Sequence, residues 1–269
     1  MEINRSGETR EFDSGAALTS VRPQPPEPRR SSSPESSMSK LIFPAAPVVT
    51  LPIVGSEDRI PVQRVFCVGR NYEEHAREMG QQVERDEPFY FTKASETVVP
   101  DGSVVPYPQG TDNFHYEFEL VVVIGAPAHN VSVADALSKV YGYACGLDMT
   151  RRDLQLKKRA KQLPWDIGKD IEHSAPISAV VPAAKFGAPV KQKIEMRQNG
   201  VTKQNADLSL MIWSVAEIIS HLSTLYHLRP GDVILSGTPA GVGPCKVGDV
   251  LEGTIEGAGS LKVTIGAPV

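Results

Sequence analysis

The sequence of 269 residues predicts a β-rich α+β fold, and three observations lead to this prediction. Short runs of β-branched and aromatic residues outnumber the stretches that have helical periodicity. The two kinds of segment do not alternate regularly along the chain, which argues against a Rossmann fold or a TIM barrel. The chain also shows no internal repeat. We therefore expect a roll that is built mainly from strands.

The N-terminal part differs from the rest of the chain in composition. Residues 23–37 are mostly Pro and Ser with some Arg and Glu, and such a segment cannot bury a core. Several Arg residues hint at a transit peptide, but acidic residues between them argue against one, and there is no apolar region of a secretory signal. We expect residues 1–39 to be a disordered tail, or an over-long start because Met38 directly precedes the ordered part. Residues 40–269 are expected to form a single catalytic domain.

In the first half of the expected domain, short apolar runs predict strands and polar periodic runs predict helices. The strands are expected at residues 64–68, 89–92, 98–105, 120–124 and 140–145. Helices are expected at residues 71–79, from 133 to 137, and at 151–162. Gly80 is placed to end the first of these helices in the left-handed conformation.

The second half contains one long amphipathic helix and a hairpin. Apolar residues recur at the helical spacing of about 3.6 residues; they are Val215, Ile218, Ile219, Leu222, Leu225 and Tyr226. Residues 229–232 stop this helix and turn into a strand at residues 233–235. Residues 251–255 and 261–265, joined across a Gly-Ala-Gly turn, predict a hairpin.

Charge and composition exclude several classes of partner. The formal net charge of −4 and the isoelectric point near 5.9 give no reason to expect a nucleic acid or an anionic membrane. No apolar stretch approaches the roughly 18 residues that a membrane helix needs. Cys67, Cys145 and Cys245 form no C-x-x-C pair, so we interpret them as small core residues of a cytoplasmic protein.

Three carboxylates suggest a metal site. Glu117 and Glu119 lie in a run that continues into an apolar strand, and residues i and i+2 of a strand point to the same face. Burying two unpaired like charges is costly, and a divalent cation would remove the repulsion. Asp148 could be a third ligand, and an oxygen-only set favours Mg²⁺ or Mn²⁺. The local pattern is equally compatible with a solvated strand edge.

Two further groups of residues could carry chemistry. His75 and Glu78 share a helical face and could form a water-activating base, or they could be ordinary charges of an exposed helix. Arg152 and Gln155 share a face of the helix that follows Asp148, and Lys169 lies in a turn-like segment. These three could donate hydrogen bonds to an oxyanion, although a surface helix with basic residues would look the same.

The glycine-rich segment at residues 236–243 follows a predicted strand. It lacks the G-K-[ST] ending of a phosphate-binding loop and does not match G-x-G-x-x-G, so nucleotide binding is not expected. Its backbone N–H groups and the Thr238 hydroxyl could bind a small carboxylate. A tight structural turn is an equal alternative.

Taken in order, five of these segments resemble the fumarylacetoacetate hydrolase superfamily. The resemblance extends from about Leu41 to the end of the chain. The matching segments are residues 68–72 with His75 and Glu78, 115–120, 148–155, 165–169 and 237–243. Five segments in the same order make a chance match very improbable.

The resemblance implies a role for each of the residues introduced above. It implies binding of Mg²⁺ or Mn²⁺ by Glu117, Glu119 and Asp148, water activation by His75 and Glu78, and substrate polarisation by Arg152, Gln155 and Lys169. Thr238 matches the residue that meets the substrate carboxylate. Further candidate substrate-binding residues are Arg70, Tyr72 and Lys93. The family fold is a mixed β-roll that usually forms a homodimer.

Within the superfamily, residues 52–55 leading into 65–70, together with residues 168–176, resemble the fumarylpyruvate hydrolases. Ala94 and Ser95 follow Lys93 where those relatives have Pro, which leaves the acyl specificity open. The resemblance implies metal-dependent hydrolysis of a 3-acylpyruvate, with fumarylpyruvate giving fumarate and pyruvate in aromatic (gentisate) catabolism. The alternatives are oxaloacetate decarboxylation or dienedioate isomerisation on the same site, or a non-catalytic binding protein. We expect a small-molecule partner.

Overall fold

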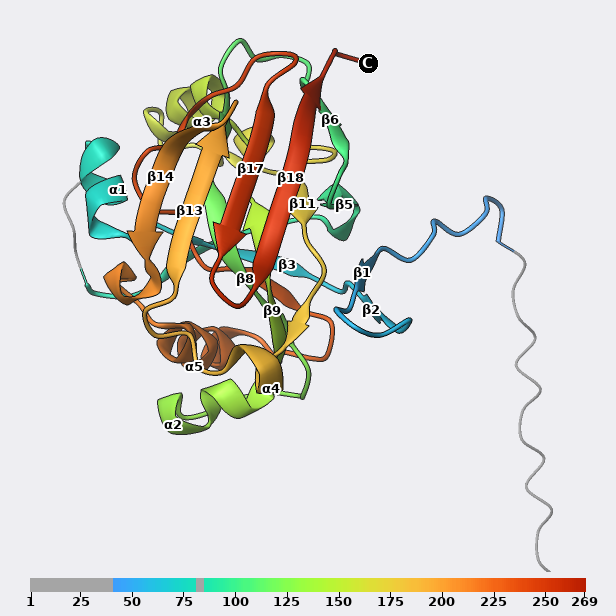
Figure 1. The fold of residues 1–269 in the computed structure, drawn as a ribbon, viewed down its shortest axis with the longest axis vertical. Coiled ribbons are helices and arrows are strands. Elements are labelled where there is room, and N and C mark those ends of the chain that lie inside the picture. Colours follow the sequence, from blue (N-terminus) through green and yellow to red (C-terminus); the bar gives the residue numbers. More distant parts are fainter. Residues whose placement is uncertain (1–40, 81–84) are drawn as a thin grey trace, which may run out of the picture. The chain divides into compact units, whose positions relative to one another are not determined.

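Strands dominate the computed structural model, which describes residues 41–80 and 85–269 (Figure 1). The expected tail at residues 1–39 lies outside the described residues. Ala46–Val269 form one unit by their internal contacts, and residues 41–45 belong to a separate unit. Among the described residues, no helix is both long and apolar enough to cross a membrane.

The largest sheet has eight strands. Its order is β4 (Phe89–Lys93), β3 (Val65–Gly69), β15 (Val233–Leu235), β8 (Phe118–Ile124), β9 (Val140–Leu147), β11 (Ala175–Ile177) and β5 (Val98–Pro100), and β12 (Val181–Pro182) also pairs with β9. The central pair, β8 and β9, is antiparallel, with Glu119 opposite Gly146 and Phe118 opposite Leu147. This register determines where the three predicted carboxylates come together.

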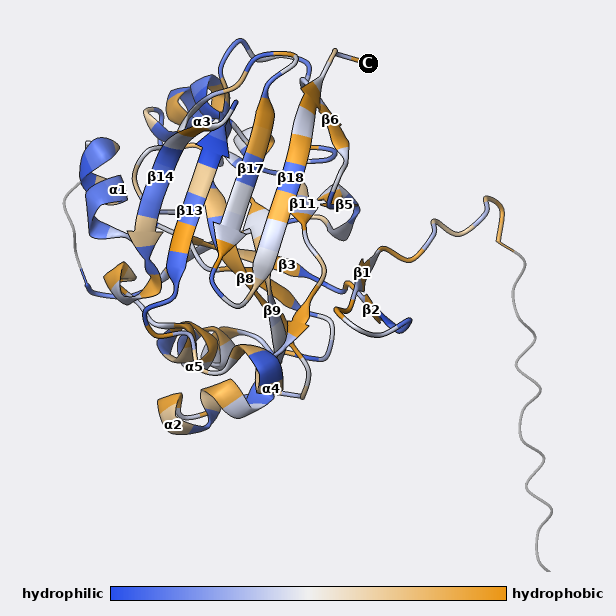
Figure 2. Ribbon diagram, in the orientation of Figure 1, coloured by the Kyte–Doolittle hydropathy of each residue, from blue (hydrophilic) through white to orange (hydrophobic). Residues whose placement is uncertain are grey.

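A second sheet of five strands packs over the first. Its order is β14 (Val201–Asp207), β13 (Lys193–Gln198), β17 (Val250–Ile255), β18 (Gly259–Gly266) and β6 (Val104–Pro106). Figure 2 shows alternating hydrophobic and hydrophilic bands along β18, as expected for a strand with one buried face. The segment predicted as 98–105 is therefore two strands, β5 and β6, which belong to different sheets.

Two small sheets complete the strands of the described residues. One consists of β10 (Thr150–Arg151), β7 (Phe114–Tyr116) and β16 (Gly243–Pro244), and the other of β1 (Thr50–Pro52) and β2 (Arg59–Pro61). Glu117 lies between β7 and β8, at the point where the chain passes from the three-stranded sheet to the eight-stranded one. The expectation that Glu117 lies within a continuous strand is therefore wrong.

The helices are short except for one. They are α1 (Glu73–Glu78), α2 (Val133–Ala136), α3 (Arg152–Arg159), α4 (Ala183–Phe186) and α5 (Val215–Leu225), with 3₁₀ turns η1 (Ser95–Thr97), η2 (Leu137–Lys139), η3 (Asp166–Gly168) and η4 (Leu208–Leu210). The predicted amphipathic helix is confirmed as α5, whose N-terminus carries a capping box of Ser214 and Glu217. Gly80 has a φ of +68°, as predicted for the residue that follows the first helix.

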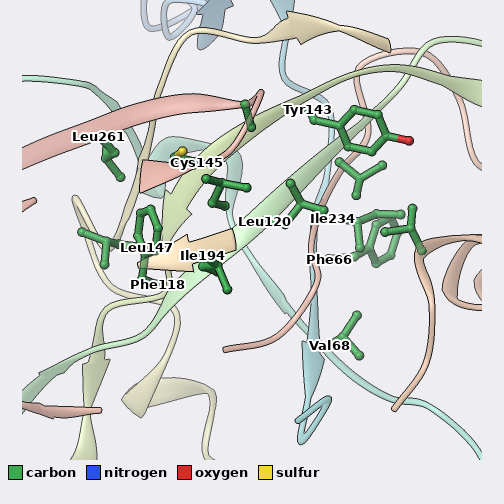
Figure 3. Packing of buried hydrophobic residues seen from close by; sticks show 14 of the residues in the cluster. Phe66, Val68, Phe118, Leu120, Tyr143, Cys145, Leu147, Ile194, Ile234 and Leu261 are labelled. Atoms are coloured by element: carbon green, nitrogen blue, oxygen red, sulfur yellow. The ribbon is translucent and has the colours of Figure 1, made fainter. Parts of the chain in front are cut away.

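The main core lies between the two large sheets and continues against the buried face of α5 (Figure 3). Phe118, Leu120 and Val122 of β8 belong to it, together with Ile194 and Leu261 of the five-stranded sheet. A second apolar cluster covers the opposite face of the eight-stranded sheet. It contains Val121 and Val123 of β8, together with Leu51 and Ile60 of the two-stranded sheet. All three cysteines are buried and free, as predicted.

Candidate metal and active site

The three predicted carboxylates meet at one end of β8. The antiparallel register continues past the ends of β8 and β9, so the Asp148 N–H donates to the Glu117 carbonyl over 2.8 Å. Glu119 is two residues further along. One carboxylate oxygen from each of the three residues lies within 4.8 Å of the others, and all three side chains are buried.

Three cations surround two of these carboxylates. Lys169 Nζ donates to Glu117 Oε2 over 2.6 Å and to Asp148 Oδ2 over 2.5 Å. Arg152 donates to Glu117 Oε1. Lys93 Nζ lies 2.9 Å from Asp148 Oδ1, but it donates to Ser174 Oγ and to the carbonyls of Met149 and Lys169. Asp148 Oδ1 is therefore buried without a hydrogen-bond donor.

Glu119 has no cationic partner among the described residues. It accepts one hydrogen bond, from the Gly237 N–H over 2.7 Å. Burial, and then the charges of Asp148 and Glu117, raise its pKa well above the usual range. Burial acts in the same direction on Glu117, but Lys169 and Arg152 outweigh it and lower that pKa. A divalent cation would bind the Asp148 oxygen that lacks a hydrogen-bond donor and would neutralise the charge of Glu119. This set of oxygen ligands therefore fits Mg²⁺ or Mn²⁺.

The glycine-rich loop fixes two protein carboxylates with its backbone. The Gly237 N–H binds Glu119, and the Gly241 N–H binds Glu78 at 3.2–3.3 Å. Both glycines have a φ of +98°, which disfavours any residue with a Cβ. A Cβ at Gly237 would lie 2.6 Å from the Asn71 Cβ, and one at Gly241 would lie 2.0 Å from the Lys203 carbonyl oxygen. These two amides are therefore directed at the protein's own carboxylates.

His75 and Glu78 are brought together on α1. The Nδ1 of His75 lies 3.3 Å from Glu78 Oε2. Burial of Glu78 works against its charge, but the hydrogen bonds from His75 and from the Gly241 amide outweigh it and lower the pKa of Glu78. An ionised Glu78 orients the imidazole and leaves Nε2 as the nitrogen that is available to other groups.

A cavity of about 130 Å³ opens beside the carboxylates. Eight of the predicted site residues line it: Arg70, His75, Glu117, Glu119, Arg152, Gln155, Lys169 and Thr238. Its apolar wall includes Phe89, Phe91 and Trp165, whose ring centroids lie 5.1–6.2 Å apart in pairs. The cavity thus combines an acidic end, a cationic helix face and an aromatic wall.

Helix α3 supplies the cationic face. Arg152, Gln155 and Arg159 recur at i, i+3 and i+7, so they share one side of the helix, and all three line the cavity. Arg152 Nη1 donates to Gln155 Oε1 over 2.5 Å. Gly168 lets the Lys169 segment approach α3, because a Cβ there would lie 2.9 Å from the backbone nitrogen of Gln155.

Some predicted residues do not line the cavity. Lys93 is buried behind Asp148 and contacts it directly. Tyr72 is buried against a separate pocket near Leu210 and Pro239, and its hydroxyl has no partner among the described residues. Thr238 does line the cavity, but its hydroxyl donates to the Phe118 carbonyl over 2.9 Å.

Two residues near the cavity were absent from the sequence prediction. Gln204 of β14 is buried and donates to Thr238 Oγ1 and to the Pro239 carbonyl, both over 2.7 Å, so it braces the glycine-rich loop. The Asn199-Gly200 turn signals the hairpin that carries Gln204. Arg159 could have been found by extending the helical spacing of Arg152 and Gln155 by one step.

Comparison with known proteins gives a consistent result. The family profile "Fumarylacetoacetate (FAA) hydrolase C-terminal" matches residues 64–266. A fumarylpyruvate hydrolase of Ralstonia sp is 49% identical over 191 residues, which cover 70% of this chain and 98% of the relative. The mitochondrial oxaloacetate tautomerase of Bos taurus is 43% identical over 206 residues, covering 77% and 93%.

One solved structure extends this result to the fold. The crystal structure of fumarylpyruvate hydrolase from Pseudomonas aeruginosa in complex with Mn²⁺ and pyruvate has a TM-score of 0.83 and 44% identity to this chain. It covers 85% of this chain and 100% of its own. The predicted β-rich roll is therefore confirmed.

Proposed function

Because the chain belongs to the fumarylacetoacetate hydrolase family, we propose that it hydrolyses the C–C bond of a 3-acylpyruvate, converting fumarylpyruvate to fumarate and pyruvate. The observation that carries the proposal is the buried carboxylate triad, because two of its members, Glu117 and Glu119, line one cavity with His75 and with the polar face of α3. Similarity to two fumarylpyruvate hydrolases supports this choice of substrate.

The metal site is proposed to be Glu117, Glu119 and Asp148, with Mg²⁺ or Mn²⁺. A bound ion supplies Lewis acidity and a positive charge for the 2-oxo acid end of the substrate. The unneutralised Glu119 and the orphaned Asp148 oxygen support this assignment. The Mn²⁺ in the Pseudomonas aeruginosa relative is consistent with it.

Water activation is assigned to His75 and Glu78. Glu78 holds the Nδ1 side of the ring, so Nε2 takes a proton from water as its oxygen attacks the C4 carbonyl. The C3–C4 bond then breaks, the acyl group leaves as fumarate, and C3 of the pyruvate enolate takes up a proton. The atoms of one water molecule are thus divided between the two products.

Stabilisation of the oxyanion at C4 is assigned to Lys169, Gln155 and Arg152. Burial works against the charge of Lys169, but Asp148 and Glu117 outweigh it and raise the pKa of its ammonium group in the metal-free protein. A preorganised cation in a buried site is an effective donor to an oxyanion. Of the four candidate substrate-binding residues, Arg70 and Thr238 line the cavity and remain proposed, whereas Tyr72 and Lys93 lie outside it. A homodimer and a role in aromatic catabolism are proposed from the family resemblance, and a cytoplasmic location is proposed from the three free cysteines.

A second candidate function is proton transfer or decarboxylation on oxaloacetate. The 43% identity to the mitochondrial oxaloacetate tautomerase favours it, because that relative matches nearly the same part of the chain. Neither reaction needs water at a C4 carbonyl. The water-activating role of His75 is thus specific to hydrolysis. We expect His75→Ala to abolish hydrolysis of fumarylpyruvate, and retention of this activity would exclude that role.

The test of the proposed function is fumarylpyruvate consumption by the purified protein, before and after chelation and re-addition of Mn²⁺ or Mg²⁺. We expect release of pyruvate and fumarate that chelation stops and metal restores. Oxaloacetate, assayed in parallel, distinguishes the second candidate. Absence of fumarylpyruvate turnover with metal present would contradict the hydrolase assignment, and activity that survives thorough chelation would contradict the metal site.

A further inference from the structure

Arg159 is the cavity-lining residue of α3 that the proposed reaction does not use. It lies seven residues after Arg152, which corresponds to two helical turns, or about 10 Å along the axis. Arg152 is occupied by Glu117 and Gln155 at the carboxylate end of the cavity. Arg159 therefore lies on the same face of the helix but further from the carboxylates.

The cations near Arg159 leave it in a positively charged environment. Within residues 41–80 and 85–269, Lys169 and Arg152 pair with carboxylates, whereas Arg159 and Arg70 have no carboxylate partner. Arg70 instead lies over the Phe89 ring, 5.3 Å from its centroid. Burial, followed by the charges of Arg70 and Arg152, lowers the pKa of Arg159. Such a cluster of guanidinium groups favours an anion.

The wall between the two ends of the cavity is aromatic, and at the carboxylate end Lys169 Nζ lies 5.0 Å from the centroid of the Phe91 ring. Trp165 packs edge-on against both Phe89 and Phe91, and Phe89 extends to Arg70. A substrate with its 2-oxo acid at the carboxylate triad would run along this wall towards Arg159. Its far end would meet two guanidinium groups, which bind carboxylates in a bidentate geometry.

We propose that Arg159, assisted by Arg70, binds a second carboxylate at the acyl end of the substrate. This proposal rests on the proposed hydrolysis and deepens it, because it restricts the substrates to 3-acylpyruvates whose acyl group ends in a carboxylate. Arg159 is thus a specificity-determining residue for dianionic substrates.

The first test compares Arg159→Ala with the unaltered protein on fumarylpyruvate and on acetylpyruvate, which lacks the second carboxylate. Loss of a charged hydrogen bond should lower kcat/KM for fumarylpyruvate about 10- to 100-fold and leave acetylpyruvate nearly unchanged. Arg159→Lys should recover part of the loss. Lys157→Ala is the matched control, because Lys157 is exposed on the same helix and does not line the cavity. An equal loss on both substrates, or no loss on fumarylpyruvate, would overturn the proposal.

A second test does not depend on hydrolysis. The Mn²⁺-loaded protein is titrated calorimetrically with 2-oxoheptanedioate and with 2-oxoheptanoate, which have equal chain length and no C4 carbonyl to attack. The unaltered protein should bind the dioate more tightly, and Arg159→Ala should remove this preference. If the protein hydrolysed neither acylpyruvate, the proposed function would fail while this measurement still decided the role of Arg159. Equal binding of the two acids by the unaltered protein would refute that role.

Discussion

The two faces of β8 differ in what holds them in place. On the inner face, Phe118, Leu120 and Val122 pack into the apolar core between the two large sheets. On the opposite face, the apolar residues end at Val121, and Glu119 takes the next position towards the cavity. Buried ion pairs add little net stability compared with apolar packing, because desolvation of the charges is costly. The comparison indicates that the inner face stabilises the fold and the opposite face carries the chemistry.

The largest expected effect is on the inner face. Phe118→Ala should lower the free energy of unfolding by about 3–5 kcal/mol, since the fully buried ring packs so closely on Gly253 that a Cβ there would lie 2.3 Å from it. Urea unfolding of the metal-free protein measures this. A loss below about 1 kcal/mol would mean that the core between the sheets relaxes around the cavity left by the ring.

On the opposite face, the effect should be on turnover rather than on folding. Lys169→Ala should reduce kcat about 100- to 1000-fold, because it removes the proposed oxyanion donor. Thermal unfolding with saturating Mn²⁺ should change far less, since the added cation offsets the lost ammonium beside Glu117 and Asp148. Near-normal turnover of this variant would show that Lys169 only balances charge.

The smallest expected effect concerns a single carboxylate on the opposite face of β8. Glu119→Gln should lower Mn²⁺ affinity by at least about 10- to 100-fold, measured calorimetrically. The metal-free protein should be no less stable at neutral pH. The raised pKa means that ionisation of Glu119 opposes folding there, and Gln can still accept the Gly237 hydrogen bond. Glu252→Gln, on the surface of β17, is the control. A lower stability of the metal-free variant would contradict the claim that ionisation of Glu119 opposes folding.

Much of this arrangement could be predicted from local sequence. The spacing of apolar residues located α5, β3 and β9, and the family resemblance named eight residues that line the cavity. Glu117 and Glu119 were predicted to come together because alternation along a strand is a local property, and the family resemblance added Asp148. They do so although Glu117 itself lies outside the strand, at the passage between two sheets.

What could not be predicted depends on contacts between distant segments. The glycine-rich loop could have bound a substrate carboxylate, and only the tertiary structure shows its amides directed at Glu119 and Glu78. Lys93 was expected at the substrate, but the pairing of β4 with β3 places it behind Asp148. Neither outcome follows from the residues near these positions in the sequence.

The glycine-rich loop couples the retention of the metal to the orientation of His75. Gly237 and Gly241 lie four residues apart, and their amides set the positions of the Glu119 and Glu78 carboxylates. A backbone change in this loop would therefore alter metal retention and the orientation of His75 together. Divergence towards a new substrate would meet less resistance at the aromatic wall and at Arg159, where side chains can be exchanged one at a time.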